Sequence, residues 1–561
     1  MRMFKGLLLG SAAALVSVAG AKAADLPTRQ AAPIEYVRIC DTYGSGFFYI
    51  PGTDTCLKVG GLVLGEIRSY DAGYSISPLG ATGTASGLGV PGLSAASAVN
   101  PFTTAPTAGS TIRTGAGGAT AFGYVPSSTQ YANARTRDSY GWASLGRIEL
   151  DARTGTPWGT LRSFIRVDSF VGTGQANTGS IQTSSSFTTG NYTNVVNSAV
   201  RETTIVSKAF IQFAGLTAGR AQSMFDFYAN AYNYQNISGS NATTQLLAYT
   251  YSFGGGFSST LSVEDVSARQ AGVGSTVTGT VSTGPGLGAG GAAVAGFGGI
   301  AGTTFTGNPA GMRLPDIVGN VRVDQPWGAA QLSAAGHQVR ASLFSSTAGA
   351  GTYGFPAATD NAYGWAIQGG LQLNADYLSP GDKLWLQAAY EKGAVSYIWG
   401  NNLASSYGTV NGLRFQGSGF TPSDTSAGWN SNIYDCVFTF SGACEQQSGW
   451  SIVGAYKHYW LPSLASAVYG SYTQINYSNN ALAGFGGAVG VANLKGTRVG
   501  TNLVWTPVKG FDIGAEFMYV NSTQSRPVGL ATDAVLTSVG LPAYRGSTNE
   551  YEGRLRVQRA F

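Results

Sequence analysis

Hydrophobic and polar residues alternate along many segments of this chain, and residues 139–170 hold the clearest example. In both halves of this range apolar and small side chains share one face. The other face carries Arg147, Glu149, Asp151 and Arg153 in the first half and Arg162, Arg166 and Asp168 in the second. Between the halves, the segment Gly155 to Gly159 contains a proline and two glycines, which favour a tight turn. This period of two predicts a β-hairpin with one apolar and one polar face.

The end of the chain repeats this pattern. Apolar residues or glycine occupy every second position from Tyr551 through Leu555 to Val557, and the chain ends at Phe561. The intervening positions hold Glu552, Arg554 and Arg556. Lipid requires apolar side chains on one face of a spanning strand, and an aqueous interior accepts charge on the other. Unpaired backbone groups cannot face lipid, so such strands must close into a barrel. The segment is typical of the last strand of an outer-membrane β-barrel.

Alternation and turn signals together predict sixteen strands, joined in pairs by short turns. The connections between the pairs are longer and rich in Gly, Ser, Thr and Asn, notably 71–138, 268–312 and 398–447. Short turns on one side and long loops on the other predict an all-β transmembrane antiparallel barrel with long extracellular loops. The predicted strands are 57–70, 139–153, 159–170, 201–213, 216–223, 245–253, 257–267, 313–325, 328–340, 362–377, 383–397, 448–460, 464–477, 494–507, 510–523 and 549–561.

The start of the chain carries an export signal. Arg2 and Lys5 precede an apolar stretch, and Ala21-Lys22-Ala23 is an A-x-A cleavage site. We therefore predict a cleaved signal peptide at residues 1–23, an N-terminal segment at 24–56 and the barrel at 57–561. No later stretch is long and apolar enough for a membrane helix. Together these features predict location in a bacterial outer membrane.

Composition supports this class of protein. Only 11% of the residues are charged, against 81 glycines, 29 tyrosines and 26 phenylalanines. A soluble domain would carry about twice that charged fraction. Removing Arg2, Lys5 and Lys22 leaves 33 − 3 = 30 basic and 28 acidic residues, a net charge of +2. The mature chain is nearly neutral and lacks a basic run, so we expect no nucleic-acid partner.

The four cysteines fall in two local pairs within polar sequence. In an oxidising compartment, Cys40 with Cys56 and Cys436 with Cys444 are predicted to form short-loop disulfides. A metal site is the alternative, but neither pair has C-x-x-C spacing and the two histidines lie far from both.

Barrel size predicts function. About eight strands leave a bore filled by side chains, whereas sixteen leave an aqueous channel. No P-loop, H-E-x-x-H or G-x-S-x-G motif is present, so neither an enzyme, a cofactor nor a metal is expected. Glu149 and Asp151 could imitate a pair of catalytic acids, but their arginine neighbours favour ion-paired channel lining.

Two stretches of the chain, residues 37–58 and 209–227, resemble a known family. The first, Val37 to Lys58, is similar to the opening of mature alphaproteobacterial general-diffusion porins of rhizobia and Brucella relatives. The second, Ala209 to Phe227, is similar to that family's segment before the pore-constricting third loop. The resemblance implies a homotrimer of sixteen-stranded barrels that passes ions and small hydrophilic solutes.

The assignment of the segment after residue 223 as the third loop predicts a constriction of the bore. Residues 224–244 form the third loop, in which Asp226 is the only charge. Folded into the bore, the loop would bring Asp226 towards cations of the wall, and opposed charges would create a transverse field that filters solutes. The predicted cations are Lys208, Arg162, Arg166, Arg498, Arg554 and Arg556, with Arg220 at the base of the loop. Alternatively, Asp226 pairs with Arg220 and only holds the loop in place.

Other expected partners follow from a barrel in this membrane. They are outer-membrane lipid, lipopolysaccharide and the barrel-assembly machinery, which would recognise the C-terminal strand. The competing hypothesis is a structural or adhesive barrel whose long loops bind a partner while its bore is closed.

Overall fold

The computed structural model describes residues 38–71, 140–173, 201–271, 273–275, 280–281, 303–347, 356–399, 433–439, 443–483, 492–526, 534 and 547–561. The chain divides into two compact units, one ending at Leu57 and the other beginning at Lys58. The predicted signal peptide, residues 1–23, lies outside the described residues.

A disulfide cross-links the first unit. Helix η1 (Asp41–Tyr43) is followed by β1 (Phe48–Tyr49), which pairs antiparallel with the start of β2 (Thr55–Asp71) at Cys56 and Leu57. Cys40 and Cys56 are bonded and fully buried together with Phe47. The prediction of this disulfide is confirmed, and the bond constrains a segment that has only a small apolar core.

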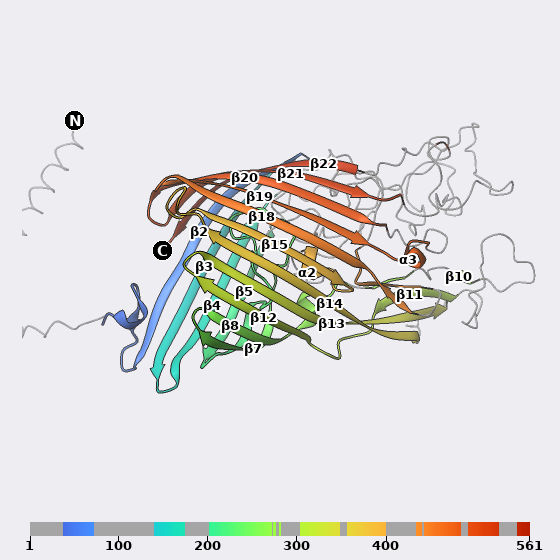
Figure 1. Cartoon of the computed structure of the whole chain (residues 1–561), viewed down its shortest axis with the longest axis horizontal. Coiled ribbons are helices and arrows are strands. Elements are labelled where there is room, and N and C mark those ends of the chain that lie inside the picture. The colour runs from blue at the N-terminus through green and yellow to red at the C-terminus, as the bar shows by residue number, and fades with distance from the viewer. Residues whose placement is uncertain are drawn as a thin grey trace, which may run out of the picture. The chain divides into compact units, whose positions relative to one another are not determined.

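The second unit is a closed barrel of sixteen antiparallel strands (Figure 1). Each strand pairs with the next, and β22 pairs with β2, which closes the sheet. All sixteen predicted strands are confirmed, with ends that differ by up to seven residues; the predicted strand 383–397 ends at Lys392, before helix α2 (Ser396–Trp399). After β2 they are β3 (Tyr140–Thr156), β4 (Gly159–Gly172), β5 (Arg201–Phe213), β6 (Leu216–Gln222), β7 (Thr243–Gly254), β8 (Phe257–Glu264), β12 (Asp316–Gln325), β13 (Gly328–Thr347), β14 (Pro356–Asn374), β15 (Lys383–Lys392), β18 (Ser448–Leu461), β19 (Leu464–Asn476), β20 (Leu494–Val508), β21 (Phe511–Gln524) and β22 (Ser547–Ala560).

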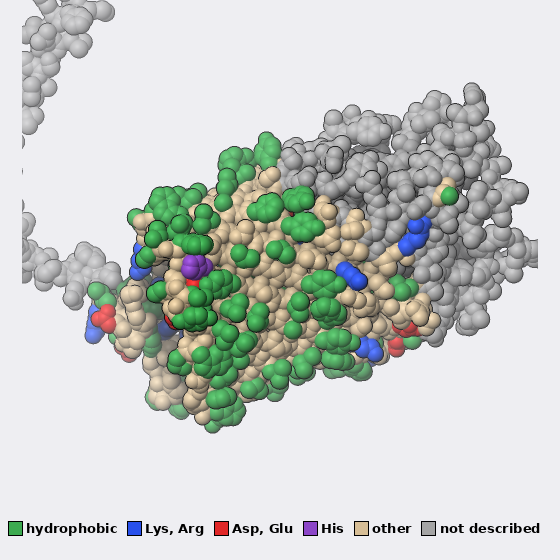
Figure 2. Space-filling view, turned by 45° about the horizontal axis from the view of Figure 1, so that its top comes forward, with side chains coloured by type: hydrophobic (Ala, Val, Ile, Leu, Met, Phe, Trp, Pro, Cys, Tyr) green, Lys and Arg blue, Asp and Glu red, His purple; other side chains and the backbone are tan. Residues whose placement is uncertain are grey.

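Side chains alternate between the two faces of the wall, as the sequence predicts. On β22, Tyr551, Leu555 and Val557 lie exposed on the outer face, while Glu552 and Arg554 are buried on the inner face. Figure 2 shows hydrophobic side chains spread over the outer wall. Among the residues that the structure describes, no helix is long and apolar enough to cross a membrane.

The long loops contain structure that alternation does not predict. Helix η4 (Val266–Ala268), β9 (Val273–Ser275), β10 (Thr280–Val281) and β11 (Thr303–Pro309) lie between β8 and β12. Helix α2 (Ser396–Trp399), β16 (Cys436–Phe438) and β17 (Cys444–Gln446) lie between β15 and β18, and α3 (Asn479–Ala483) follows β19. β9, β16 and β17 form a separate three-stranded sheet, so two loops distant in sequence are joined by backbone hydrogen bonds.

Candidate pore constriction

The segment between β6 and β7, residues 223–242, lies inside the barrel, and we call it the inner loop. Phe225, Tyr228 and Ile237 are at most 3% exposed, and Tyr228 and Ile237 pack in one cluster with barrel residues such as Val453. A loop that reached into solvent would leave these side chains in water. The loop therefore lies in the bore, as predicted for the third loop.

Backbone groups of the inner loop are bound by polar side chains of the wall. Glu516 on β21 accepts hydrogen bonds from the backbone amides of Tyr234 and Gln235 at 2.6 and 2.8 Å. Further bonds to the loop backbone come from Asn320, Gln331, Gln368, Gln387, Ser471, Arg498, Asn502 and Arg554. These groups extend from β12 to β22, so this wall holds the loop along its length. Buried backbone groups need such partners, because an unpaired one costs about 1–3 kcal/mol.

Asp226 does not face the bore, which differs from the predicted constriction. Its carboxylate pairs with Arg269 at 3.0 Å, and both side chains are 1% exposed. It also accepts hydrogen bonds from the hydroxyl of Ser240 and from the backbone amide of Ala242. Burial alone lowers the pKa of Arg269, but the Asp226 carboxylate raises it above its ordinary value. Asp226 therefore holds the loop, as the alternative proposed, but through Arg269 and not through Arg220.

The start of the inner loop is seated in the same way. Glu264 accepts hydrogen bonds from the Ser223 hydroxyl at 2.7 Å and from the Met224 amide at 2.9 Å. Phe227 lies over Gly370 of β14, where an added Cβ would come within 2.2 Å of the phenyl ring. A glycine at this inward position of the strand therefore makes room for the loop.

Two predicted lumen arginines lie beneath the inner loop. Arg498 donates to the carbonyl of Asn236 at 3.0 Å, and Arg554 donates to the carbonyl of Tyr234 at 3.1 Å. Each is only 3% exposed. They point inward as the alternation predicts, but the loop covers them, so they support it and do not line open water.

Arg556 borders the same loop and keeps some exposure. It pairs with Glu66 of β2 at 2.7 Å, its side chain is 16% exposed, and its guanidinium lies 4.0 Å from the ring centroid of Tyr234. Burial raises the pKa of Tyr234 to about 12, even though Arg556 opposes that rise. The phenol is therefore neutral at physiological pH.

The wall formed by β3, β4 and β5 carries a group of solvated cations, and we call it the basic wall. Arg166 pairs with Glu149 at 2.6 Å, Arg147 pairs with Asp168 at 2.6 Å, and Arg162 and Arg153 share Asp151 at 2.9 and 2.8 Å. These four arginine side chains are 23 to 28% exposed. They therefore contact water in the bore, in contrast to the covered arginines of β20 and β22.

The remaining two predicted cations have different positions. Lys208 on β5 is the register partner of Arg166, and among the described residues it has no ion pair. Arg220 on β6 is the register partner of Ala209 and Gln245, which belong to the outward rows of their strands. Lys208 thus belongs to the basic wall, whereas Arg220 faces away from the bore.

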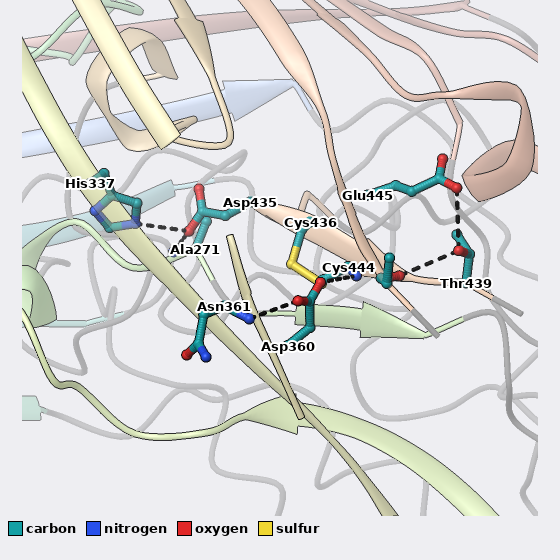
Figure 3. The surroundings of a disulfide bond; sticks show 10 residues. Ala271, His337, Asp360, Asn361, Asp435, Cys436, Thr439, Cys444 and Glu445 are labelled. Carbon is teal, nitrogen blue, oxygen red and sulfur yellow. Dashed lines mark hydrogen bonds and ion pairs between the residues drawn. A yellow bond between two sulfur atoms is a disulfide. The ribbon is translucent and has the colours of Figure 1, made fainter. Parts of the chain in front are cut away.

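The second predicted disulfide is confirmed and lies near the barrel interior (Figure 3). Cys436 and Cys444 join β16 to β17 and are at most 5% exposed. Next to them, buried Asp435 accepts hydrogen bonds from the amides of Ala271 and Val395 at 2.7 and 3.0 Å and lies 3.7 Å from His337 of β13. One carboxylate thus joins two loops to the wall.

Glu445 of β17 anchors the same sheet at its far side. Ser478, Asn480 and Thr439 all donate hydrogen bonds to its carboxylate. Partial burial raises its pKa, but these hydrogen bonds outweigh burial and hold the pKa below its usual range. The ionised form is therefore favoured by the folded loop.

Sequence reasoning missed Arg269, Glu264, Glu516 and Asp435. Glu264 and Glu516 occupy inward positions of predicted strands, so a search for carboxylates facing a loop could have found them. Arg269 and Asp435 lie in long loops, where no periodicity indicates direction. In the part of the chain that the structure describes, no group of three His, Cys, Asp or Glu side chains could hold a metal ion.

Comparison with known proteins matches most of this chain to one family. The Porin subfamily matches residues 25–76 and 111–540. Porin Omp2b of Brucella suis biovar 1 is 27% identical over 395 residues, which cover 66% of this chain and 81% of that protein. Porin Omp2b of Brucella neotomae is 30% identical over 267 residues, covering 46% of this chain and 53% of that protein.

Solved structures with some likeness to the chain include an outer-membrane channel and a porin. The channel DcaP of Acinetobacter baumannii has a TM-score of 0.45 and 13% identity, covering 91% of this chain and 99% of that one. An anion-selective porin from Comamonas acidovorans has a TM-score of 0.37 and 9% identity. The match covers 90% of this chain and 100% of that one.

Proposed function

Starting from the fact that this chain belongs to the Porin subfamily, we propose that its channel selects solutes by the charge of the basic wall. The chain is an outer-membrane β-barrel that forms a channel for passive diffusion. This membership favours an open bore over the adhesive barrel with a closed one, and it points to a channel and not an enzyme. The solutes are ions and small hydrophilic molecules, among which anions are preferred.

The proposal rests on one observation: the solvated wall is basic, and the loop opposite adds no charge. The basic wall holds Arg147, Arg153, Arg162, Arg166 and Lys208 against Glu149, Asp151 and Asp168, so its net charge is 5 − 3 = +2. On the loop, Asp226 is neutralised by buried Arg269. A bore with an excess of one sign attracts ions of the other. The charge excess of the filter therefore comes from the basic wall and not from the loop.

A charge reversal at Lys208 tests this proposal. Lys208→Glu takes the net charge of the basic wall from +2 to 0, and no ion pair among the described residues is broken. In planar bilayers with a salt gradient, we expect the parent reversal potential to indicate anions and the variant potential to move towards cations. Lys392→Glu on the exposed outer row of β15 is the matched control and should change nothing. A cation-selective parent, or equal shifts in both variants, would overturn the proposal.

The proposed assembly is a homotrimer that meets through the outer face of β3 to β6. That face carries Ser144, Ser163 and Ser169 exposed, and Arg220 lies on its outward row. An arginine facing lipid at the bilayer centre costs about 2–4 kcal/mol. The outer faces of β3 to β6 and of β13 to β20 both carry exposed aliphatic side chains, such as Ile148, Ile165 and Ile211 on the first and Leu386, Ile452 and Val499 on the second, so Arg220 is the feature that marks the first face. A subunit contact at the first face would keep Arg220 out of lipid.

Cross-linking distinguishes these two faces. The described cysteines are all in disulfides, so an introduced thiol is the one available for reaction there. Ser163→Cys should give trimers with a short bis-maleimide, while Thr501→Cys on the outer row of β20 should not. Equal cross-linking at both positions, or at neither, would contradict this interface.

A further inference from the structure

Two phenylalanines face the bore within the basic wall. Phe164 of β4 and Phe210 of β5 are direct register partners, and their rings stack at a centroid distance of 5.2 Å and an angle of 25°. Both rings are only half-buried. The interior of a water-filled barrel is normally polar, so a solvated aromatic pair there lacks the usual benefit of burying its apolar surface.

The neighbouring strand has a glycine beside this pair. Gly219 of β6 is the register partner of Phe210 and has φ +120°, a conformation that favours glycine. A Cβ there would lie 2.3 Å from the carbonyl oxygen of Ala209. No side chain stands at this position, and on this side the Phe210 ring packs against the buried cluster of Ala221, Leu246 and Ala248, which leaves the ring half-exposed towards the bore.

Cations frame the aromatic pair on two sides. The guanidinium of Arg162 lies 5.2 and 5.4 Å from the ring centroids of Phe164 and Phe210, and that of Arg166 lies 5.9 Å from Phe164. Arg162 shares the carboxylate of Asp151 with Arg153, so two cations meet at this carboxylate. Lys208 adds another, next to Arg166 in register.

From this juxtaposition we infer that the basic wall contains a binding site for aromatic carboxylates in transit. The ring of the solute packs against Phe164 and Phe210, and its carboxylate is bound by Lys208 and the adjacent guanidinium of Arg166. This inference rests on the proposed function and extends it from charge selection to a solute class. Benzoate is the simplest member of that class.

The chemistry of the wall favours this class over its neighbours. Aliphatic anions would use the cations but gain no ring contact, and neutral aromatics would gain the ring contact but leave the excess charge unmatched. A stacked or edge-to-face ring pair contributes about 0.5–1.5 kcal/mol beyond burial, which corresponds to roughly two- to tenfold in affinity.

The test compares two anions of equal charge and similar size. Single-channel current is measured in a potassium chloride background while sodium benzoate or sodium cyclohexanecarboxylate is added. Benzoate should reduce the current saturably, with a half-saturating concentration roughly two- to tenfold below that of cyclohexanecarboxylate. Equal half-saturating concentrations, or no saturation by benzoate, would overturn the inference.

Variants assign the effect to the site. Phe164→Leu with Phe210→Leu keeps apolar bulk and removes the aromatic faces, so the two half-saturating concentrations should become equal. Phe210→Leu alone should narrow the difference if the double variant does not insert. Lys208→Gln should weaken both anions together. Phe517→Leu, on the outer face of β21, is the control and should preserve the parental preference. A preference that survives loss of both rings would refute the site.

Failure of this inference is distinguishable from failure of the proposed function. A protein that conducts chloride with the expected reversal potential but shows equal block by both acids loses only the aromatic site. A protein that inserts without anion preference loses the charge filter itself, and the aromatic site with it.

Discussion

The pair between Asp226 and Arg269 holds the inner loop. The variant Arg269→Met tests how much this pair contributes to the stability of the seated loop. Methionine keeps apolar volume but removes the guanidinium. That group donates to Asp226 at 3.0 Å and to Ser240 at 2.7 Å, and lies 4.2 Å from the ring centroid of Tyr397. Both charged side chains are 1% exposed, so the variant leaves a carboxylate buried without its cation.

Breaking a buried pair in this way costs about 3–5 kcal/mol, because the remaining charge cannot be rehydrated in place. The cost falls on the loop and not on the wall, since Asp226 belongs to the loop and Arg269 to a neighbouring loop segment. At about 1.4 kcal/mol per tenfold, the population of the open loop should rise by roughly two to three and a half orders of magnitude.

Hydrogen exchange measured by mass spectrometry reports the population of the open loop directly. Amides of residues 224–242 should lose protection by that factor, while amides in the centre of β14 keep theirs. Arg322→Met is the comparison variant: its guanidinium also borders the loop, 5.6 Å from the ring centroid of Phe227, but its pair with Asp324 is 34 and 56% exposed and should contribute no more than about 1 kcal/mol.

A double variant separates charge from shape. Asp226→Leu combined with Arg269→Met replaces the buried pair by apolar side chains, which is often close to neutral. It should recover much of the lost protection, although the hydrogen bond to the Ala242 amide is not replaced. The reasoning is refuted if Arg269→Met and Arg322→Met have the same effect on the loop.

Three further outcomes are expected. Cys436→Ser with Cys444→Ser should lower the stability of the β16–β17 hairpin by about 2.5 kcal/mol for a sequence separation of 8, measured by hydrogen exchange there, with barrel amides unaffected. Gly370→Leu should clash with Phe227 and destabilise the seated loop by about 1–3 kcal/mol, detected as faster exchange in the inner loop; unchanged exchange would argue against the contact. Because the folded protein lowers the pKa of Glu445, its contribution is present above about pH 4.5 and is lost as pH falls through the lower folded value, so hairpin protection should differ between parent and Glu445→Gln at pH 6 and converge as the pH is lowered below the folded pKa.

The barrel could be predicted from the sequence because each spanning strand must satisfy one rule. A strand between lipid and water shows its two faces as alternation, and this placed Arg147, Arg166 and Glu552 on the inner face. Alternation reports only which side of the wall a residue faces. It cannot report what covers that side, so Arg498 and Arg554 were predicted correctly as inward and incorrectly as bordering open water.

For the inner loop, the sequence likewise predicted the position but not the contacts. The resemblance of residues 209–227 to the family's segment before its third loop predicted insertion into the bore. The role of Asp226 depended on a partner in another loop, and Arg269 has no periodic context that reveals its direction. Arg220 was misplaced for a simpler reason: the segment from 216 to 222 is too short for its phase to be read from apolar residues alone.

Because Asp226, the one charge of the inner loop, is buried, pore width and ion selectivity can be changed separately in this channel. A charged loop facing the wall would couple pore width to selectivity, since moving the loop would move the field. Here the loop contributes bulk and its charge is matched internally, while the basic wall contributes the field from strands that the barrel holds rigid. Substitutions at Arg269 or Gly370 should therefore act on conductance and loop order, and substitutions at Lys208 on ion preference. The separation of these two effects follows from Asp226 lying against Arg269 instead of the bore.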